Sequence, residues 1–279
     1  MIVWQRIVRT GMSERGFIST LTSMTWRVWL SRAPGPRPRE VDALGDVAGL
    51  RLVHLQCHLG LETLQFAQAG ARVTGLDFSP AAIRAAQDLA ERSGLSDRAR
   101  FVCADVYDAV GALEAQTFDV VYVSAGSLCW LPSVERWAEQ VAALASPGGR
   151  FYLHEKHPVE WALADDQPVF THPYFEEPDP YVEDSESTYT DSARGLVNRR
   201  NYQWNHGIGE IVTALVRHGL QLDWLLEHDW AVRQVFSWLV TDDGERWTTP
   251  AGMPRIPLSF ALLAHRPTNG HRDAAKPNP

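Results

Sequence analysis

The sequence lacks several features that would place a chain in a large class of proteins at once. It has no run of about 18 apolar residues, so no transmembrane helix and no membrane partner are expected. Residues 1–16 lack the apolar core and cleavage site of a secretory signal, and a cytoplasmic location is therefore expected. No group of cysteines and histidines has the spacing of zinc ligands, so no metal is predicted.

Cysteine and positive charge are also scarce. The three cysteines, Cys57, Cys103 and Cys129, all lie in or next to predicted strands, which fits reduced, buried thiols better than a disulfide framework. Lys and Arg number 26 against 34 Asp and Glu, which gives a formal net charge of −8 at pH 7. This balance argues against a protein that grips the phosphates of nucleic acid, so no nucleic-acid partner is expected.

What is present is an alternation of strand and helix patterns. Apolar stretches of strand length are predicted over 51–56, 72–76, 101–104, 118–124, 151–154, 220–227 and 257–265. Helical patterns are predicted over 60–69, 79–90, 133–144 and 208–218. This alternation predicts a parallel sheet with helices on both faces, and such sheets bind ligands at the carboxyl ends of their strands.

The stretch from Leu52 to Asp77 carries the clearest chemistry. Gly60 allows a tight turn between the first strand and its helix. Asp77 ends the second strand about 20 residues later, where a carboxylate can accept both vicinal hydroxyls of a ribose. The alternative is that Asp77 only caps the helix that begins near Ser79. A nucleoside-cofactor half-site is the sharper hypothesis.

The chain is predicted to have five segments. These are an N-terminal helical cap and connector (1–43), a cofactor-binding core (44–155), an acidic, aromatic lid inserted after the fifth strand (156–205), the completion of the core sheet (206–266) and a disordered tail (267–279). The first segment could instead cover the outside of the sheet as an ordinary helix. The acidic lid could select a cationic acceptor or simply form a solvated surface.

Five sequence motifs together resemble the class I S-adenosylmethionine-dependent methyltransferases, over roughly residues 44–266. The motifs are LQCHLGLETL, GARVTGLDFSPAAI, FDVVYVSAGSLCWLP, LASPGGRFYLHEKHP and YQWNHGIGEIVTAL. They are similar to a bacterial, small-molecule type with an LQCHxGxxTL turn. The resemblance implies an α/β, Rossmann-like sheet of seven strands, mostly parallel with the last strand antiparallel. It also implies S-adenosyl-L-methionine as cofactor, bound over the ends of strands one to four, and S-adenosyl-L-homocysteine as product.

The resemblance assigns cofactor binding to a set of positions at the strand ends. These are Gln56, Cys57, His58, Gly60, Asp77, Phe78, Asp105, Val106, Ser124, Ala125 and Gly126. Asp77 would take the ribose, Phe78 would pack against the adenine, and Asp105 would accept from its amino group. The turn departs from the usual pattern, because Gln56 and His58 stand where glycines are common and His54 stands where an acid is common.

Histidines and tryptophans near the strand ends are candidates for the acceptor site. His154, His157 and His206 are candidate general bases, since a histidine titrates near neutral pH. Each could instead be a structural, hydrogen-bonded histidine. The candidate substrate-binding residues are Trp26, Trp130, Tyr174 and Trp204. Trp130 could alternatively pack under the helix that follows it.

The expected activity is in-line transfer of a methyl group to an oxygen or nitrogen atom of a small-molecule acceptor, by the chain alone or as a homodimer. Alignment of nucleophile, methyl and sulfur would be the main task of the protein. A protein that binds the nucleoside without turnover is an alternative. A nicotinamide-dependent oxidoreductase is a weaker one, because the turn lacks the G-x-G-x-x-G spacing. The sequence after the fourth strand lacks the Pro-Pro-Tyr type of motif, which disfavours a nucleic-acid methyltransferase.

Overall fold

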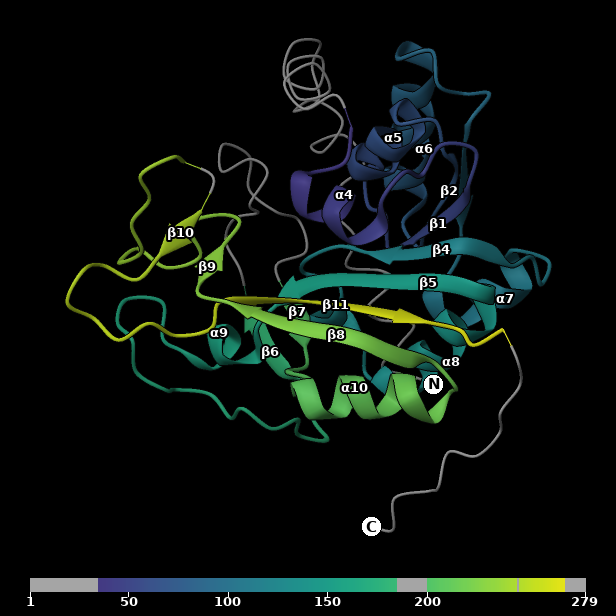
Figure 1. Cartoon of the computed structure of the whole chain (residues 1–279). Helices are drawn as coiled ribbons and strands as arrows, with labels where there is room; N and C mark the ends of the chain where they lie inside the picture. Colours follow the sequence, from purple (N-terminus) through teal and green to yellow (C-terminus); the bar gives the residue numbers. More distant parts are fainter. Residues whose placement is uncertain (1–34, 185–199, 245, 269–279) are drawn as a thin grey trace. The chain divides into compact units, whose positions relative to one another are not determined.

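A computed structural model describes residues 35–184, 200–244 and 246–268 (Figure 1). Contacts within the chain divide it into two compact units, one of residues up to 122 with 181–203, the other of 123–180 with the residues from 204 onward. Trp26 and most of the expected segments 1–43 and 267–279 lie outside the described residues. The five predicted segment boundaries stay a prediction.

The first unit contains the parallel strands. They are β1 (Arg51–Leu55), β2 (Arg72–Asp77), β3 (Ala99–Cys103) and β4 (Phe118–Val123), whose last residue is assigned to the second unit. Strand β1 pairs in parallel with β2 and β4, and β2 pairs in parallel with β3. The burial of β1 and β4 along nearly their whole length fits strands that are covered on both faces.

The second unit contains three further strands. They are β5 (Ala145–Lys156), β8 (Gln221–His228) and β11 (Ser259–His265), and β11 is antiparallel to both of the others. The strand order of the seven-stranded sheet is β3-β2-β1-β4-β5-β11-β8. The prediction of a seven-stranded, mostly parallel sheet with an antiparallel last strand is confirmed.

Helices α5 (Leu61–Gln68) and α6 (Pro80–Arg92) lie against β2 and β3 (Figure 1). The described part of the first unit also contains α4 (Pro38–Leu44) and the short α7 (Ala109–Ala112), which follows the 3₁₀ turn η2 (Val106–Asp108). Helix α6 begins as its sequence predicts: the Ser79 hydroxyl accepts from the N–H of Ala82 at 3.3 Å, with Pro80 as the first helical residue.

The helices of the second unit are α8 (Val134–Leu144), α9 (Pro158–Ala162) and α10 (Ile208–Arg217), with a 3₁₀ turn η3 (Leu128–Trp130). Helix α10 lies along α8 and β8 (Figure 1). Ser133, where the sequence predicts that this helix begins, caps α8 by accepting from the N–H of Arg136. Within the described part of the chain, every helix is too short or too polar to cross a lipid bilayer.

Two short antiparallel pairs are also present among the described residues. Strands β6 (Tyr181–Asp184) and β7 (Arg200–Gln203) pair in the first unit. Strands β9 (Trp230–Ala231) and β10 (Trp247–Thr248) pair in the second. Neither pair is predicted from the sequence, because such short strands have no measurable alternation.

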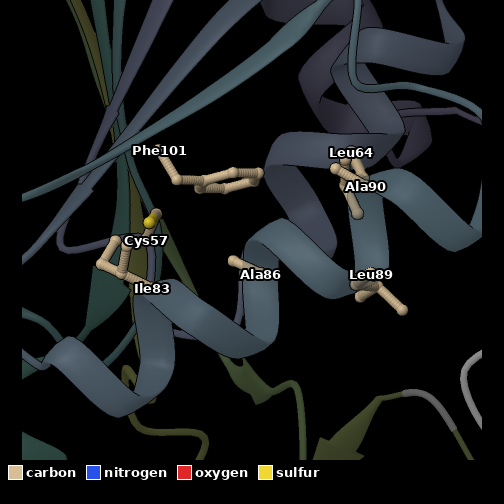
Figure 2. Close-up of a cluster of buried hydrophobic side chains, with 7 residues drawn as sticks. All are labelled: Cys57, Leu64, Ile83, Ala86, Leu89, Ala90 and Phe101. Carbon is tan, nitrogen blue, oxygen red and sulfur yellow. The ribbon is translucent and has the colours of Figure 1, made fainter.

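An apolar cluster supports the turn after β1. Its buried members are Cys57, Leu64, Ile83, Ala86, Leu89, Ala90 and Phe101 (Figure 2). The Phe101 ring is accommodated by two glycines: a Cβ on Gly75 would lie 2.6 Å from this ring, and one on Gly60 would lie 2.5 Å from it. Contacts this short are not tolerated in packed interiors, so both glycines are needed for Phe101 to fit.

Three expectations from the sequence are wrong in detail. Strand β5 begins at Ala145, ahead of the predicted Phe151, because Gly148 and Gly149 exchange backbone hydrogen bonds with Arg266 and extend the ladder. Strand β3 begins at Ala99, before the predicted Phe101, since Ala99 already pairs with Val73. Cys103 is exposed and not buried, because it is the last residue of β3.

Candidate functional site

The carboxylate of Asp77 is held by two backbone hydrogen bonds at the end of β2. Oδ2 accepts from the N–H of His58 and Oδ1 from the N–H of Ser79, each at 2.9 Å. The residue is 7% exposed. A carboxylate has about four acceptor positions, so each oxygen can accept a further hydrogen bond. Asp77 therefore positions Ser79, the residue that caps α6, and its remaining acceptor positions leave room for a ligand.

The turn between β1 and α5 has an unusual backbone. Gln56, His58 and Gly60 have φ angles of 56°, 52° and 71°, in the left-handed region. Between them, the N–H of Cys57 donates to the carbonyl of Leu76 at 3.0 Å. The left-handed region costs a non-glycine residue about 1–2 kcal/mol. Glycine adopts such angles without strain, but this turn has glutamine at position 56 and histidine at position 58.

Phe78, Asp105 and Val106 follow β2 and β3. The Phe78 side chain is 45% exposed, which leaves an aromatic face available to a flat ligand. Asp105 accepts from the N–H of Tyr107 at 2.9 Å and so caps η2. Val106 is buried. The structure therefore places Asp77, Phe78 and the turn residues 56–60 at the carboxyl ends of neighbouring strands.

His54 lies in the interior of the first unit. Its Nδ1 is 2.8 Å from the hydroxyl oxygen of Thr63, and its ring contacts the Tyr122 ring edge-on at 4.8 Å. Burial lowers its pKa to about 4, so the ring is neutral at pH 7. The Tyr122 hydroxyl in turn donates to the buried carboxylate of Glu40 at 2.8 Å. These contacts give His54 a structural role in the interior of the unit.

In the second unit, Glu155 of β5 fixes the residues that follow β4. Its carboxylate accepts backbone hydrogen bonds from Gly126, from Ser127 at 2.8 Å, from Leu128 at 3.0 Å and from Lys156 at 2.8 Å. Burial raises its pKa, and the four N–H groups oppose that rise. Residues 124–128, which include the predicted cofactor positions Ser124, Ala125 and Gly126, are called the Glu155 loop below.

Sequence reasoning missed Glu155. The available signal was an acidic residue within the otherwise apolar run FYLHEK, since a carboxylate in a buried strand requires partners. The run of apolar residues identified the strand, but the partners lie nearly thirty residues earlier in the chain.

His154 and His157 are engaged by their surroundings. Nδ1 of His157 accepts from the N–H of Val159 at 3.1 Å, and Nε2 lies 2.8 Å from a carboxylate oxygen of Glu227. Burial lowers the pKa of His157, and the bond to Glu227 opposes this effect. His154 is buried, and its ring stacks on Trp230 with 5.7 Å between centroids. Neither ring is presented on an open surface.

His206 is buried where the chain enters α10. Nε2 is 2.7 Å from the carbonyl oxygen of Leu131, and Nδ1 is 3.0 Å from Glu176 and 3.5 Å from Glu210. Burial alone would lower its pKa, but the hydrogen bonds and charges of the two carboxylates outweigh burial and raise the pKa to about 9. The ring is therefore protonated at neutral pH.

The other predicted substrate residues differ in exposure. Trp130, in η3, is 44% exposed, whereas Trp204 is buried. The N–H of Trp204 donates to the carbonyl of Cys129 at 2.9 Å, which brings these two segments together. Asn205, which sequence reasoning missed, donates to the carbonyls of Pro158, Pro173 and Tyr174. Tyr174 is thereby held next to the segment that carries Trp204.

Comparison with known proteins gives one domain match. Residues 53–153 match the model of a family described as a methyltransferase domain. The chain is 34% identical to a ubiquinone biosynthesis O-methyltransferase of Methylocella silvestris over 115 aligned residues. The aligned region covers 41% of this chain and 43% of that protein. The chain spans less than half the length of the first curated relatives that it matches.

Solved structures with the same fold cover most of the chain. An S-adenosylmethionine-dependent methyltransferase from Mesorhizobium loti is 23% identical, with a TM-score of 0.55, over 82% of this chain and 96% of the other. The [4+2]-cyclase SpnF is 17% identical, with a TM-score of 0.52, over 82% of this chain and 79% of the other. The fold is therefore that of these proteins, and their two names show that the fold alone does not fix the reaction.

Proposed function

We propose that the chain is a class I S-adenosylmethionine-dependent methyltransferase that moves a methyl group to an oxygen or nitrogen atom of a small-molecule acceptor. The methyltransferase-domain match over 53–153 and the likeness to S-adenosylmethionine-dependent methyltransferases support this proposal. S-adenosyl-L-methionine supplies a methyl group on a cationic sulfur, which a nucleophile can take by in-line displacement. The task of the protein is then to hold the reactants in line.

The observation that carries the proposal is the fixed carboxylate of Asp77. Hydrogen bonds from His58 and Ser79 set its position before any ligand arrives, so little ordering remains when a ribose binds. Phe78 offers an exposed aromatic face beside it. We assign the ribose to Asp77, the adenine to Phe78, Asp105 and Val106, and the methionine end to residues 56–60. Ser124, Ala125 and Gly126 are proposed as further cofactor contacts.

For the acceptor, we propose Trp130, Tyr174 and Trp204 as binding residues. Trp130 supplies exposed apolar area, and Tyr174 and Trp204 are held by Asn205 and Cys129. The role of Trp26 stays a prediction, because this residue lies outside the described part of the chain.

The hydrogen bonds of the candidate bases bear on how the reaction is catalysed. A base needs a free lone pair, and His157 and His206 both have two engaged ring nitrogens. We therefore propose that alignment of the reactants supplies most of the rate enhancement. The assignment of a base to His154, His157 or His206 stays a prediction.

Calorimetry with S-adenosyl-L-homocysteine tests the proposal directly. The Phe78→Ala variant should weaken binding by about tenfold, because base–aromatic stacking contributes about 1–3 kcal/mol. Phe170→Ala, which also removes an exposed ring, is the matched control and should bind like the unaltered protein. If the unaltered protein bound neither S-adenosyl-L-homocysteine nor S-adenosyl-L-methionine, the proposal would be wrong.

Two other functions give different results in the same assays. A protein that binds the nucleoside without turnover would bind S-adenosyl-L-methionine but transfer no labelled methyl group to any compound of a metabolite extract. A nicotinamide-dependent oxidoreductase would change the absorbance of a nicotinamide cofactor. The side chains at positions 56 and 58 argue against it, since a backbone that approaches a pyrophosphate closely needs glycine there.

A further inference from the structure

Three ligand-type side chains meet at the start of α10. They are Glu176, His206 and Glu210, called the His206 cluster below, and one ligand atom from each lies within 4.8 Å of the others. His206 and Glu210 lie one helical turn apart, whereas Glu176 comes from a segment thirty residues earlier in the chain. All three belong to the second unit.

The Leu131 carbonyl decides which nitrogen of His206 faces the carboxylates. A carbonyl oxygen can only accept, so Nε2, at 2.7 Å from it, carries a hydrogen. Nδ1 is then the nitrogen turned toward Glu176 and Glu210, at 3.0 and 3.5 Å. Metal-binding histidines are set in this way, with the second ring nitrogen donating to a backbone carbonyl or a carboxylate.

The charges of the cluster favour a cation of higher charge than a proton. His206 is 4% exposed, and carboxylate oxygens of Glu176 and Glu210 lie 3.0 and 3.5 Å from its Nδ1, so two negative charges converge on one buried nitrogen. One imidazolium between two carboxylates has a formal charge of −1. A divalent ion bound to a neutral ring and the same two carboxylates brings the formal charge to zero.

We infer that the His206 cluster binds a divalent transition-metal ion through Nδ1 of His206 and one carboxylate oxygen each of Glu176 and Glu210. One imidazole and two carboxylates suit Zn²⁺ or Mn²⁺, with water in the remaining positions, better than Ca²⁺ or Mg²⁺, which prefer oxygen ligands alone. Spacing in the sequence could not reveal this set, because Glu176 is separated from the other two by the whole β6–β7 excursion.

A bound ion would connect two segments that carry aromatic side chains. Tyr174 lies two residues before Glu176, and Trp204 lies two residues before His206. The ion would therefore order both segments, in addition to the hydrogen bonds that Asn205 already provides. This inference does not depend on the reaction proposed above.

The test is calorimetric titration of the metal-stripped full chain with ZnCl₂ and with MnCl₂ at pH 7.5. We expect one ion to bind per chain. Glu176→Gln and Glu210→Gln should each weaken binding by about tenfold or more, since each removes a charged ligand. Glu177→Gln removes the same charge from an exposed neighbour and should bind like the unaltered protein.

Two results would overturn the inference. One is the absence of binding of both ions at millimolar concentration. The other is equal affinity in Glu176→Gln, Glu210→Gln and Glu177→Gln, which would place the ion elsewhere, for example at His218 and Glu135, whose side chains are 3.1 Å apart. Circular dichroism checks that each variant folds. An anomalous-scattering peak about 2.0–2.2 Å from Nδ1 of His206 in zinc-soaked crystals decides the question without any variant.

Discussion

The backbone N–H of His58 donates to Oδ2 of Asp77 at 2.9 Å, so the turn after β1 and the carboxylate that ends β2 are held together as one piece. The other oxygen of this carboxylate accepts from Ser79, the residue that caps α6. Asp77 therefore joins β1, β2 and α6 where we propose that the cofactor binds. The structural role of Asp77 and its proposed role in binding the ribose can be separated experimentally.

Asp77→Asn should weaken binding of S-adenosyl-L-homocysteine by about tenfold or more. It should also lower the free energy of unfolding by about 1–3 kcal/mol, because the new NH₂ group must face the N–H of His58 or of Ser79. Asp119→Asn is a matched control, since Asp119 accepts from the N–H of Arg51 at 2.8 Å at the opposite end of β1. The control should lose stability but bind normally. Unchanged binding by Asp77→Asn would remove the ribose assignment.

Gly75→Ala should lower the free energy of unfolding by about 1–3 kcal/mol, because its methyl group would lie 2.6 Å from the Phe101 ring and 2.8 Å from the sulfur of Cys57. Phe101→Leu should partly rescue it, so that the double variant loses less stability than the two single losses combined. Gly111→Ala in helix α7 is the control. Among the described residues, no atom beyond its chain neighbours and the helix backbone lies within 4 Å of the added methyl group, and alanine favours a helix, so this change should be neutral or slightly stabilising. Urea unfolding measures all four variants, and strict additivity would contradict the packing argument.

The backbone strain at Gln56 can be measured by comparing two substitutions at one position. With φ at 56°, Gln56→Gly should be more stable than Gln56→Ala by about 1 kcal/mol, because alanine is disfavoured in the left-handed region. At Asp88, in the exposed face of α6, the order should reverse, since glycine is about 1 kcal/mol worse than alanine within a helix. The same order at both positions in thermal unfolding would show that Gln56 is unstrained.

His54 should make stability depend on pH. Its pKa is about 4 in the folded protein against 6.5 for the ordinary value, so below pH 6.5 the unfolded chain gains a proton that the folded chain excludes. The contribution is fully present above pH 6.5, decreases as the pH falls toward 4 and amounts to about 3 kcal/mol at 1.36 kcal/mol per pKa unit. Unfolding free energies of the unaltered protein and His54→Asn, compared at pH 7.5 and 4.5, should show this difference. A constant difference would contradict it.

Local patterns in the sequence were sufficient for the order of the main strands and helices. Ser79 with Pro80, and Ser133, marked helix starts that the structure confirms, because capping depends on residues only three positions apart. The start of β5 was missed, because it is set by pairing with Arg266, far along the chain. Patterns within a few neighbouring residues carry no information on a pairing partner more than a hundred residues away.

The position of Asp77 at the end of β2 was predictable, because it follows from the length of one local apolar run. The candidate site was not predictable where the chemistry depends on partners that are distant in sequence. Glu155 binds backbone groups of residues 126–128, and Glu176 meets His206 thirty residues later. The sequence also did not predict that Asp77 holds the turn after β1. Its hydrogen bond to His58 involves a backbone N–H, and side-chain patterns carry no information on such a partner.

Glu155 has a consequence for how this protein can vary. The path of the Glu155 loop is set by backbone N–H groups bound to a side chain of β5, together with the positive φ of 87° that Gly126 adopts. Of the residues in this loop, Ala125 is half-buried and has no side-chain role in holding the main chain, so its methyl group can be exchanged while the backbone keeps its course. Gly126 and the buried Leu128 are fixed by backbone angle and by packing, and the loop can vary at position 125 only as long as the glutamate is retained.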